Sequence, residues 1–184
     1  MTEELLYLWF GMISRMTHTV KMNVAMKYGG IRGLWNTSEE QLRDELTQAQ
    51  ADGFLEHRDV GKVAAYAEEL RRNDITYIYP GHKLYPRKLY DIPDPPMLLF
   101  AAGDVDVLAD LDPAVAVVGA RKASVYGREA ADRLSGELAA SGVTIVSGMA
   151  LGIDGAAHRA AMKAGGKTVA VLGSGTVSYT HLRA

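Results

Sequence analysis

Apolar positions near the N-terminus recur at spacings of three and four, which is the period of an amphipathic helix. The first apolar face comprises Leu5, Leu6, Leu8, Trp9, Ile13 and Met16. A second predicted helix contains Val24, Ala25 and Met26 and ends at Gly29-Gly30, because paired glycines favour a turn. The pattern therefore predicts at least two short helices at the start of the chain.

Polar residues mark where further helices begin. Ser38 is predicted to be an N-cap, and Gln41, three residues later, is expected to complete a capping box. Another helix is expected over residues 63–70. Residues 1–72 are thus predicted to form a small all-helical domain.

The pattern changes after residue 72. Residues 75–79 and 97–100 are short runs rich in β-branched, aromatic and apolar residues, and both are predicted to be strands. Four of the six prolines lie between them, in residues 85–96. Because proline fixes φ and lacks a backbone donor, this segment is expected to run extended along the surface.

Strands and helices alternate from residue 114 onward. Continuous apolar runs at 114–118, 143–146 and 168–172 are typical of strands buried in a parallel sheet. Amphipathic segments at 125–141 and 153–164 lie between them. The β-α-β-α-β order predicts an α/β fold, namely a partial, doubly wound, Rossmann-like parallel sheet that follows the small helical domain.

The α/β domain is predicted to span residues 73–184. On its first helix, the residues expected to face inward are Ala130, Leu134, Leu138 and Ala139. Ligands of such sheets bind beyond the carboxyl ends of the strands, so the loops that follow the strands are the candidate sites.

Composition fits a globular protein of a reducing compartment. Of 184 residues, 48% are hydrophobic and 23% charged, and the absence of cysteine excludes disulfides and thiol nucleophiles. The N-terminus is acidic and no apolar run is long enough for a membrane span, so a soluble, cytoplasmic protein is expected. Residues 1–112 carry 12 basic and 18 acidic side chains, whereas 113–184 carry 8 and 4, which favours phosphate binding in the second part.

The first loop, residues 119–127, combines glycine, arginine and serine at a predicted helix start. It lacks the second and third glycines of a dinucleotide fingerprint and the Gly-Lys-Ser/Thr of a Walker loop. Gly119, Arg121 and Ser124 would instead present backbone amides, a guanidinium and a hydroxyl, which suit a phosphate. The alternative is that Gly119 only permits the turn, Ser124 only caps the helix and Arg121 is solvated.

The second loop begins with Ser147 and Gly148, whose small size lets a ligand approach the backbone. Asp154 and His158 are four residues apart and share one helical face. They could form an acid–base dyad, but the favoured interpretation is structural, with Asp154 capping and orienting and His158 satisfied internally. Two ligands without a third make a metal site unfavourable, and no cofactor is expected.

The third loop is Gly173-Ser174-Gly175-Thr176, which on its own is a weak signal. Lys167, just before the third predicted strand, could add positive potential to the same crevice, although a solvated lysine is the simpler interpretation.

Three segments closely resemble the DprA/Smf family of DNA-processing proteins. They are Gly119-Ala120-Arg121 with Ser124 and Tyr126-Gly127, the run 147–154 followed by Ala157-His158, and the run 166–175. The stretch 85–103, with its Tyr-Pro and Asp-Pro-Pro-Met-Leu-Leu-Phe, is similar to the segment that leads into the Rossmann-like domain of that family.

The resemblance implies a cytoplasmic protein that binds single-stranded DNA, helps to load the RecA recombinase and supports natural transformation. It implies a homodimer in the full-length family, while the sequence as a whole predicts no catalysis, no metal and no membrane. By position, Arg121 would be the principal phosphate contact. Amides and hydroxyls near Gly119, Ser124, Ser147 and Gly148 would complete the DNA-binding pocket, and Lys167 would contribute charge.

The chain departs from the family pattern at three places. Ala120 replaces the usual serine, and residues 20–33 lack the Gly-x-Gly of a DNA-gripping helix-hairpin-helix, although 1–72 fits the family's SAM-like or helix-hairpin-helix-like N-terminal domain. Residues 176–184 do not follow the family and are expected to be a non-native tail of a truncated frame. The later strands and the surfaces for dimerisation and RecA would then be missing.

Two other functions remain open from the sequence. Related Rossmann-like enzymes cleave nucleotide N-glycosidic bonds, and Asp154 and His158 could serve such a reaction, although the Pro-Gly-Gly-x-Gly-Thr loop of that class is absent. A pure interaction module is the third possibility and rests on the helical first third.

Overall fold

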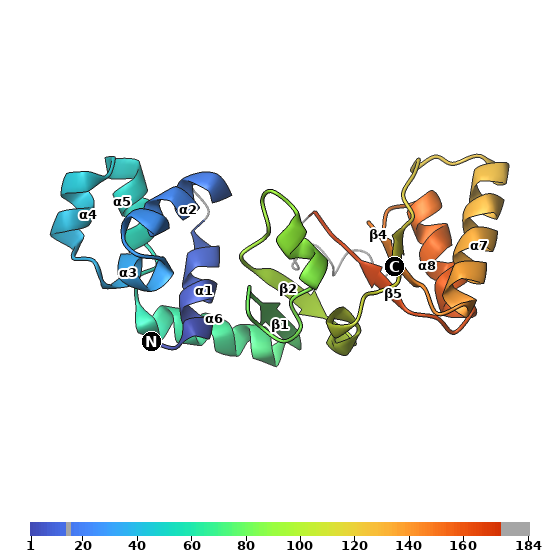
Figure 1. Cartoon of the computed structure of the whole chain (residues 1–184), viewed down its shortest axis with the longest axis horizontal. Coiled ribbons are helices and arrows are strands. Elements are labelled where there is room, and N and C mark those ends of the chain that lie inside the picture. The colour runs from blue at the N-terminus through green and yellow to red at the C-terminus, as the bar shows by residue number, and fades with distance from the viewer. Residues whose placement is uncertain (14–15, 174–184) are drawn as a thin grey trace. The chain divides into compact units, whose positions relative to one another are not determined.

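The chain folds into two compact units, Met1–Val105 and Asp106–Ala184. The computed structural model describes residues 1–13 and 16–173 (Figure 1). We call the two parts the helical unit and the α/β unit. Their division lies beyond the predicted boundary between residues 72 and 73, because the segment after residue 73 packs against the preceding helices.

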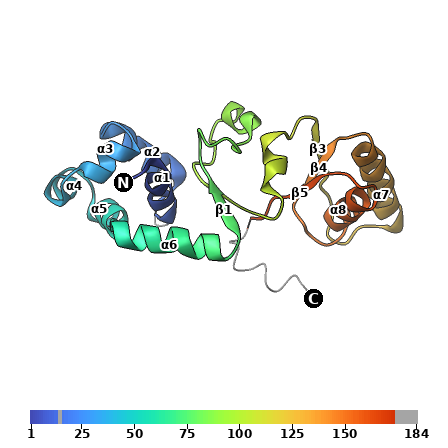
Figure 2. The same ribbon diagram turned by 90° about the horizontal axis from the view of Figure 1, so that it is seen from below.

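Short helices form most of the helical unit. In chain order they are α1 (Glu3–Met12), α2 (His18–Lys27), α3 (Ile31–Asn36), α4 (Glu39–Glu45), α5 (Gln48–Leu55) and α6 (Val60–Arg72). Figure 2 shows α6 running along the base of the other helices. The predicted all-helical character of residues 1–72 is therefore confirmed for the part that the structure describes.

Side-chain caps fix where these helices begin. Ser38 is the N-cap of α4, and its Oγ accepts a hydrogen bond from the Gln41 amide at 3.1 Å. The predicted capping box is wrong at this position, because the Gln41 side chain donates to Glu45 of the same helix instead. A reciprocal box does form at α5, between Thr47 and Gln50.

A short antiparallel hairpin completes the helical unit. Strand β1 (Ile75–Ile78) pairs with β2 (Leu99–Ala102), and the 3-10 turns η1 (Arg87–Asp91) and η2 (Val105–Ala109) flank β2 in sequence. Met97 and Leu98, just before β2, pack against the helical core. Leu98 approaches Gly11 of α1 so closely that a Cβ on the glycine would overlap its side chain.

The α/β unit contains a parallel sheet in the order β3-β4-β5. Its strands are β3 (Ala114–Ala116), β4 (Thr144–Ser147) and β5 (Thr168–Ala170), linked by α7 (Val125–Ala140) and α8 (Ile153–Lys163). The predicted β-α-β-α-β order is confirmed. Both helices lie on the same side of the strands (Figures 1 and 2), as two right-handed crossovers in one direction require.

The inward face of α7 differs in part from the prediction, since Ala139 is buried and Leu138 packs against the core cluster as expected. Leu134 is exposed, whereas the buried positions are Ala131, Ser135 and Ala139. The reason is that α7 packs closely on α8, which presents alanines such as Ala157. Small residues permit this close approach, so the buried face is set by size more than by hydrophobicity.

Within the described residues, no helix combines the length and apolar character that crossing a bilayer demands.

Candidate nucleic-acid interface

The carboxyl ends of β3, β4 and β5 lie at one edge of the sheet, because the three strands are parallel. Two loops leave this edge, one after β3 that leads to α7 and one after β4 that leads to α8. Residues 171–173 follow β5 at the same edge. We call these segments the loop edge. Ser174, Gly175 and Thr176 of the third predicted loop lie outside the described residues, as does the 176–184 tail.

A single buried carboxylate ties the first two loops together. Asp154, in the first turn of α8, accepts a hydrogen bond from the Gly119 amide at Oδ1 (3.3 Å) and from the Gly148 amide at Oδ2 (3.2 Å). The residue is only 6% exposed. Asp154 is not the N-cap of its own helix, because that position is Gly152. It orients two loops that are far apart in sequence.

Glycines at the loop edge allow very close packing. A Cβ on Gly119 would lie 2.7 Å from Cγ1 of Ile153, so a larger residue would push the first loop off α8. Gly152 has a φ of +88°, and a Cβ there would overlap the carbonyl oxygen of Ala120. That same carbonyl accepts a hydrogen bond from the Ile153 amide at 3.3 Å. The two loops therefore lock against each other through backbone contacts.

The side chains of Ser147 and His158 form hydrogen bonds inside the α/β unit. The Ser147 hydroxyl donates to the Val117 carbonyl at 2.6 Å and links β4 to the chain that follows β3. Nδ1 of His158 lies 2.7 Å from Oγ1 of Thr168, whose hydroxyl donates to the Ile145 carbonyl at 2.9 Å. Because the Thr168 hydroxyl already donates its hydrogen to Ile145, Nδ1 of His158 must be the donor, so the neutral imidazole carries its proton on Nδ1.

Burial lowers the pKa of His158, and the Asp154 carboxylate and the Ser147 backbone act in the opposite direction. The two side chains of the possible acid–base dyad engage different partners, Asp154 the loop amides and His158 the sheet. Both carboxylate oxygens of Asp154 are engaged, whereas Nε2 of His158 is buried and has no hydrogen-bond partner among the described residues. The described residues also contain no group of three or more His, Asp and Glu side chains that could hold a metal ion.

The polar groups that face outward at the loop edge include cationic side chains and a helix N-terminus. Arg121 and Lys122 are exposed in the first loop. Ser124 caps α7, and its Oγ accepts from the Gly127 amide at 3.0 Å. The amides of Val125 and Tyr126, in the first turn of this 16-residue helix, have no intrahelical acceptor and carry the positive end of its dipole.

Lys167 is not grouped with the other predicted residues. It precedes β5, and its carbonyl accepts from the Ile145 amide, so it lies at the amino ends of the strands. The loop edge is at the opposite, carboxyl ends. The direction of the predicted strand could have shown this from the sequence alone.

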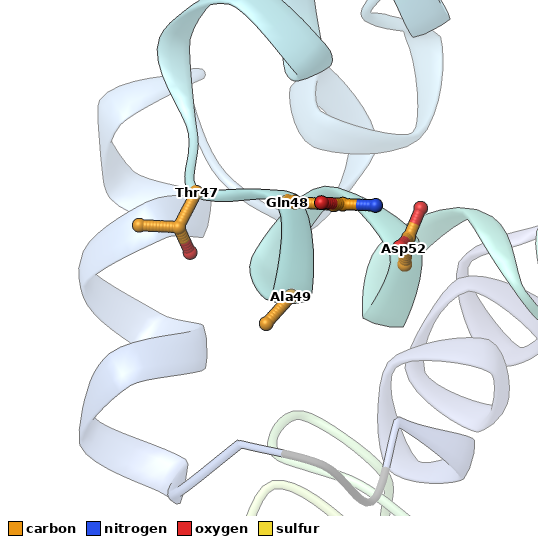
Figure 3. Close-up of a pocket in the computed structure, with 4 residues that line it drawn as sticks. All are labelled: Thr47, Gln48, Ala49 and Asp52. Carbon is orange, nitrogen blue, oxygen red and sulfur yellow. The ribbon is translucent and has the colours of Figure 1, made fainter.

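A surface hollow with a volume of about 540 Å³ lies in the helical unit (Figure 3). Thr47, Gln48, Ala49 and Asp52 line it. Two of its polar side chains are already used, since Thr47 belongs to the capping box and Asp52 pairs with Arg43 at 2.8 Å. None of the predicted site residues borders it.

Comparison with known proteins decides the family. The family model for DNA recombination-mediator protein A matches residues 76–182, more than half of the chain. This chain belongs to the DprA/Smf family. The matched region contains both loops that Asp154 joins, so the loop edge is part of the family domain.

Individual members of the DprA/Smf family are also similar to this chain in sequence. The chain is 40% identical over 113 residues to the DNA processing protein DprA of Bacillus subtilis, covering 61% of this chain and 36% of the relative. It is 43% identical over 132 residues to protein Smf of Escherichia coli, covering 71% and 34% respectively. The chain thus spans about a third of the length of these relatives.

The fold of this DprA/Smf chain also resembles a solved structure. The X-ray structure of DNA processing protein A from Streptococcus pneumoniae matches with a TM-score of 0.66 and 27% sequence identity, covering 91% of this chain and 56% of that one. The similarity supports the partial Rossmann-like fold, and the relatives are named for DNA processing.

Sequence reasoning missed one feature of the loop edge. Large apolar side chains are exposed at Val118, Val125, Tyr126, Leu151 and Val171. The signal that could have found them is their position, since each directly follows a strand, precedes α8 or opens α7.

Proposed function

We propose that this chain binds single-stranded DNA without sequence preference, by holding phosphates at the loop edge. The observation that carries the proposal is the exposed Arg121, placed on a loop that the buried Asp154 fixes from beneath. A loop already held in place loses little conformational entropy on binding. Contacts to phosphates position a strand but do not read its bases, so sequence tolerance follows.

The hydrogen bonds of the loop edge define which groups act in this proposal. The amides of Gly119 and Gly148 are committed to Asp154, and the Ser147 hydroxyl to Val117. These three residues hold the loops rather than touch the phosphate. The contacts are assigned to Arg121, to the Ser124 hydroxyl and to the free amides that open α7.

Electrostatics support the same location. Residues 113–184 carry 8 basic and 4 acidic side chains, whereas 1–112 carry 12 and 18. One of the four acids, Asp154, is buried under the loops. Residues 113–184 therefore attract a polyanion more strongly than residues 1–112 do.

We propose a binding role without catalysis, since both oxygens of Asp154 accept from loop amides, Nδ1 of His158 is bound to Thr168 and its Nε2 is buried. Transfer of the bound DNA to RecA, a role in natural transformation, assembly as a homodimer and a cytoplasmic location are proposed from family membership alone.

The test is fluorescence anisotropy of this chain with a labelled oligothymidine and a matched duplex over a series of salt concentrations. We expect preferential binding of the single strand that weakens as salt rises. Arg121→Ala should lower the affinity at least about tenfold and reduce the salt slope by about one. The control is Arg133→Ala, which removes another exposed arginine from the body of α7 and should leave binding nearly unchanged.

Equal losses of affinity in the two arginine variants would show that only the total charge of the chain determines DNA binding. Affinity unchanged by Arg121→Ala in a folded sample would move the DNA site away from the loop edge.

A further inference from the structure

The loop edge carries apolar side chains as well as cationic ones. Tyr126 is 79% exposed and Leu151 82%. Val125, which precedes Tyr126, is also exposed, as are Val118 and Val171, which follow the outer strands β3 and β5. We call these five residues the apolar rim. Exposing so many large apolar groups at one edge is unfavourable in water and marks an interaction surface.

The rim differs from the exposed apolar residues of the helical unit. Those residues are Met26, Val60, Tyr90, Ile92 and Phe100, and they are distributed over separate helices, turns and a strand. The rim residues instead follow β3, open α7, precede α8 and follow β5, so all belong to the edge that holds Arg121.

Tyr126 also lacks the ring contact that five other described tyrosines make. The ring of Tyr7 stacks on Tyr79, that of Tyr66 meets Phe100, and that of Tyr90 lies 4.9 Å from Tyr85. For Tyr126 the structure records no ring contact with any described residue. An exposed aromatic face without a partner is a stacking surface for another flat group.

We infer that the apolar rim, with Tyr126 as its principal member, binds the nucleobases of the strand whose phosphates contact the Arg121 loop. The inference rests on the proposed function and adds a base-contacting half to the same site. Tyr126 joins the two halves within one residue, because its backbone amide belongs to the positive end of α7 while its ring is exposed to solvent.

The chemistry of the rim favours a nucleic acid strand over a protein segment. A nucleotide presents an anionic phosphate and a flat apolar base a short distance apart. The loop edge offers the complement of each, with Arg121 and the α7 amides for the phosphate and the rim for the base. Every base has a π face, so stacking of this kind is tolerant of sequence, as the phosphate contacts are.

The test compares two ligands of equal length and label, oligothymidine and an abasic deoxyribose-phosphate oligomer. Tyr126→Ser should weaken oligothymidine binding about tenfold, leave abasic binding within about twofold and preserve the salt slope. Tyr126→Phe should restore the affinity, because the ring remains. Leu134→Ser, an exposed apolar residue of α7 away from its N-terminus, is the matched control and should change neither ligand.

Arg121→Ala separates this inference from the proposed function, because it should lower the affinity for both ligands. If Tyr126→Ser lowers the affinity for both ligands equally, Tyr126 supports the phosphate-binding loop and the base-contacting role is overturned. If it weakens neither, the rim is covered by another partner, such as a further part of the protein or a second copy, and the inference fails while the phosphate site stands. If the wild-type chain binds neither ligand, both proposals fall.

Discussion

The helical unit and the α/β unit bury very different kinds of side chain. In the helical unit the fully buried residues are large, among them Trp9, Phe10 and Phe54. The core cluster of the α/β unit consists of Ala139, Ile145, Ala157 and Ala161. Since burial free energy grows with apolar area, the helical unit gains far more from its core per residue.

Buried polar groups show the reverse distribution. In the part of the chain that the structure describes, the buried polar or charged residues all lie in the α/β unit, and they are Ser135, Thr144, Ser147, Asp154 and His158. Asp154 and Ser147 hold the loops at the carboxyl ends of the strands. The α/β unit therefore uses its interior to position loops, and it has less apolar burial to stabilise them.

The largest predicted loss of stability comes from a substitution in the core of the helical unit. Phe54→Ala removes a ring that lies 6.4 Å from Trp9 and is completely buried. It should reduce the free energy of unfolding of the helical unit by about 3–5 kcal/mol. Urea denaturation followed by tryptophan fluorescence measures this, because both tryptophans, Trp9 and Trp35, lie in that unit.

The exposed Met26 provides the control, since Met26→Ala should change the stability very little. Hydrogen exchange at Ile145 in β4 should be unaltered by Phe54→Ala. Faster exchange there would show that the two units unfold as one, and the contrast between their cores would then not determine separate stabilities.

A second prediction concerns close packing at the loop edge. Gly152 and Gly142 both have positive φ, +88° and +86°, but a Cβ on Gly152 would overlap the Ala120 carbonyl, whereas nothing lies near one on Gly142. Gly142→Ala should cost about 1–2 kcal/mol from backbone strain alone. Gly152→Ala should cost about 1–3 kcal/mol more, because the first loop must also move.

Thermal unfolding by circular dichroism measures both variants, and anisotropy with oligothymidine measures the loop. Only Gly152→Ala should weaken DNA binding. Equal effects of the two substitutions on stability and binding would mean that contact between the loops does not hold the site in place.

The periodicity of the chain was sufficient to predict the order of elements but not the contacts between them. Apolar runs at 114–118, 143–146 and 168–172 correspond to β3, β4 and β5 to within two residues at each end. The apolar pattern of α7, however, placed Leu134 in the core, where the structure buries Ser135. A local pattern carries no information on how closely the alanines of α8 approach.

The candidate site was likewise predicted in part. Arg121 and Ser124 lie at a helix start as their spacing indicates, because caps and turns are local. The bond from the Gly119 amide to Asp154 spans 35 residues, so no local signal reveals that this amide is unavailable to a phosphate. Long-range hydrogen bonds thus changed the roles of the glycines, while the cation remained the candidate contact.

The smallest predicted effect is a pH dependence confined to the α/β unit. Burial lowers the pKa of His158 from its ordinary value near 6.5, so the unfolded chain takes up a proton at a higher pH than the folded chain does. The stability of the unit should be fully present above about pH 6.5, fall as the pH drops below that value, and level off below the folded-state pKa.

The matched variant for this test is His158→Asn, which can donate to Thr168 but cannot be protonated. The free energy of unfolding is measured from hydrogen exchange in α8 during urea denaturation, at intervals from pH 7.5 to 5. As the pH falls, it should decrease more steeply for the wild type than for the variant. Groups that titrate in both proteins cancel in the difference. Parallel curves would show that His158 contributes nothing to the acid sensitivity, and that the polar interior of the α/β unit costs it no stability as the pH falls.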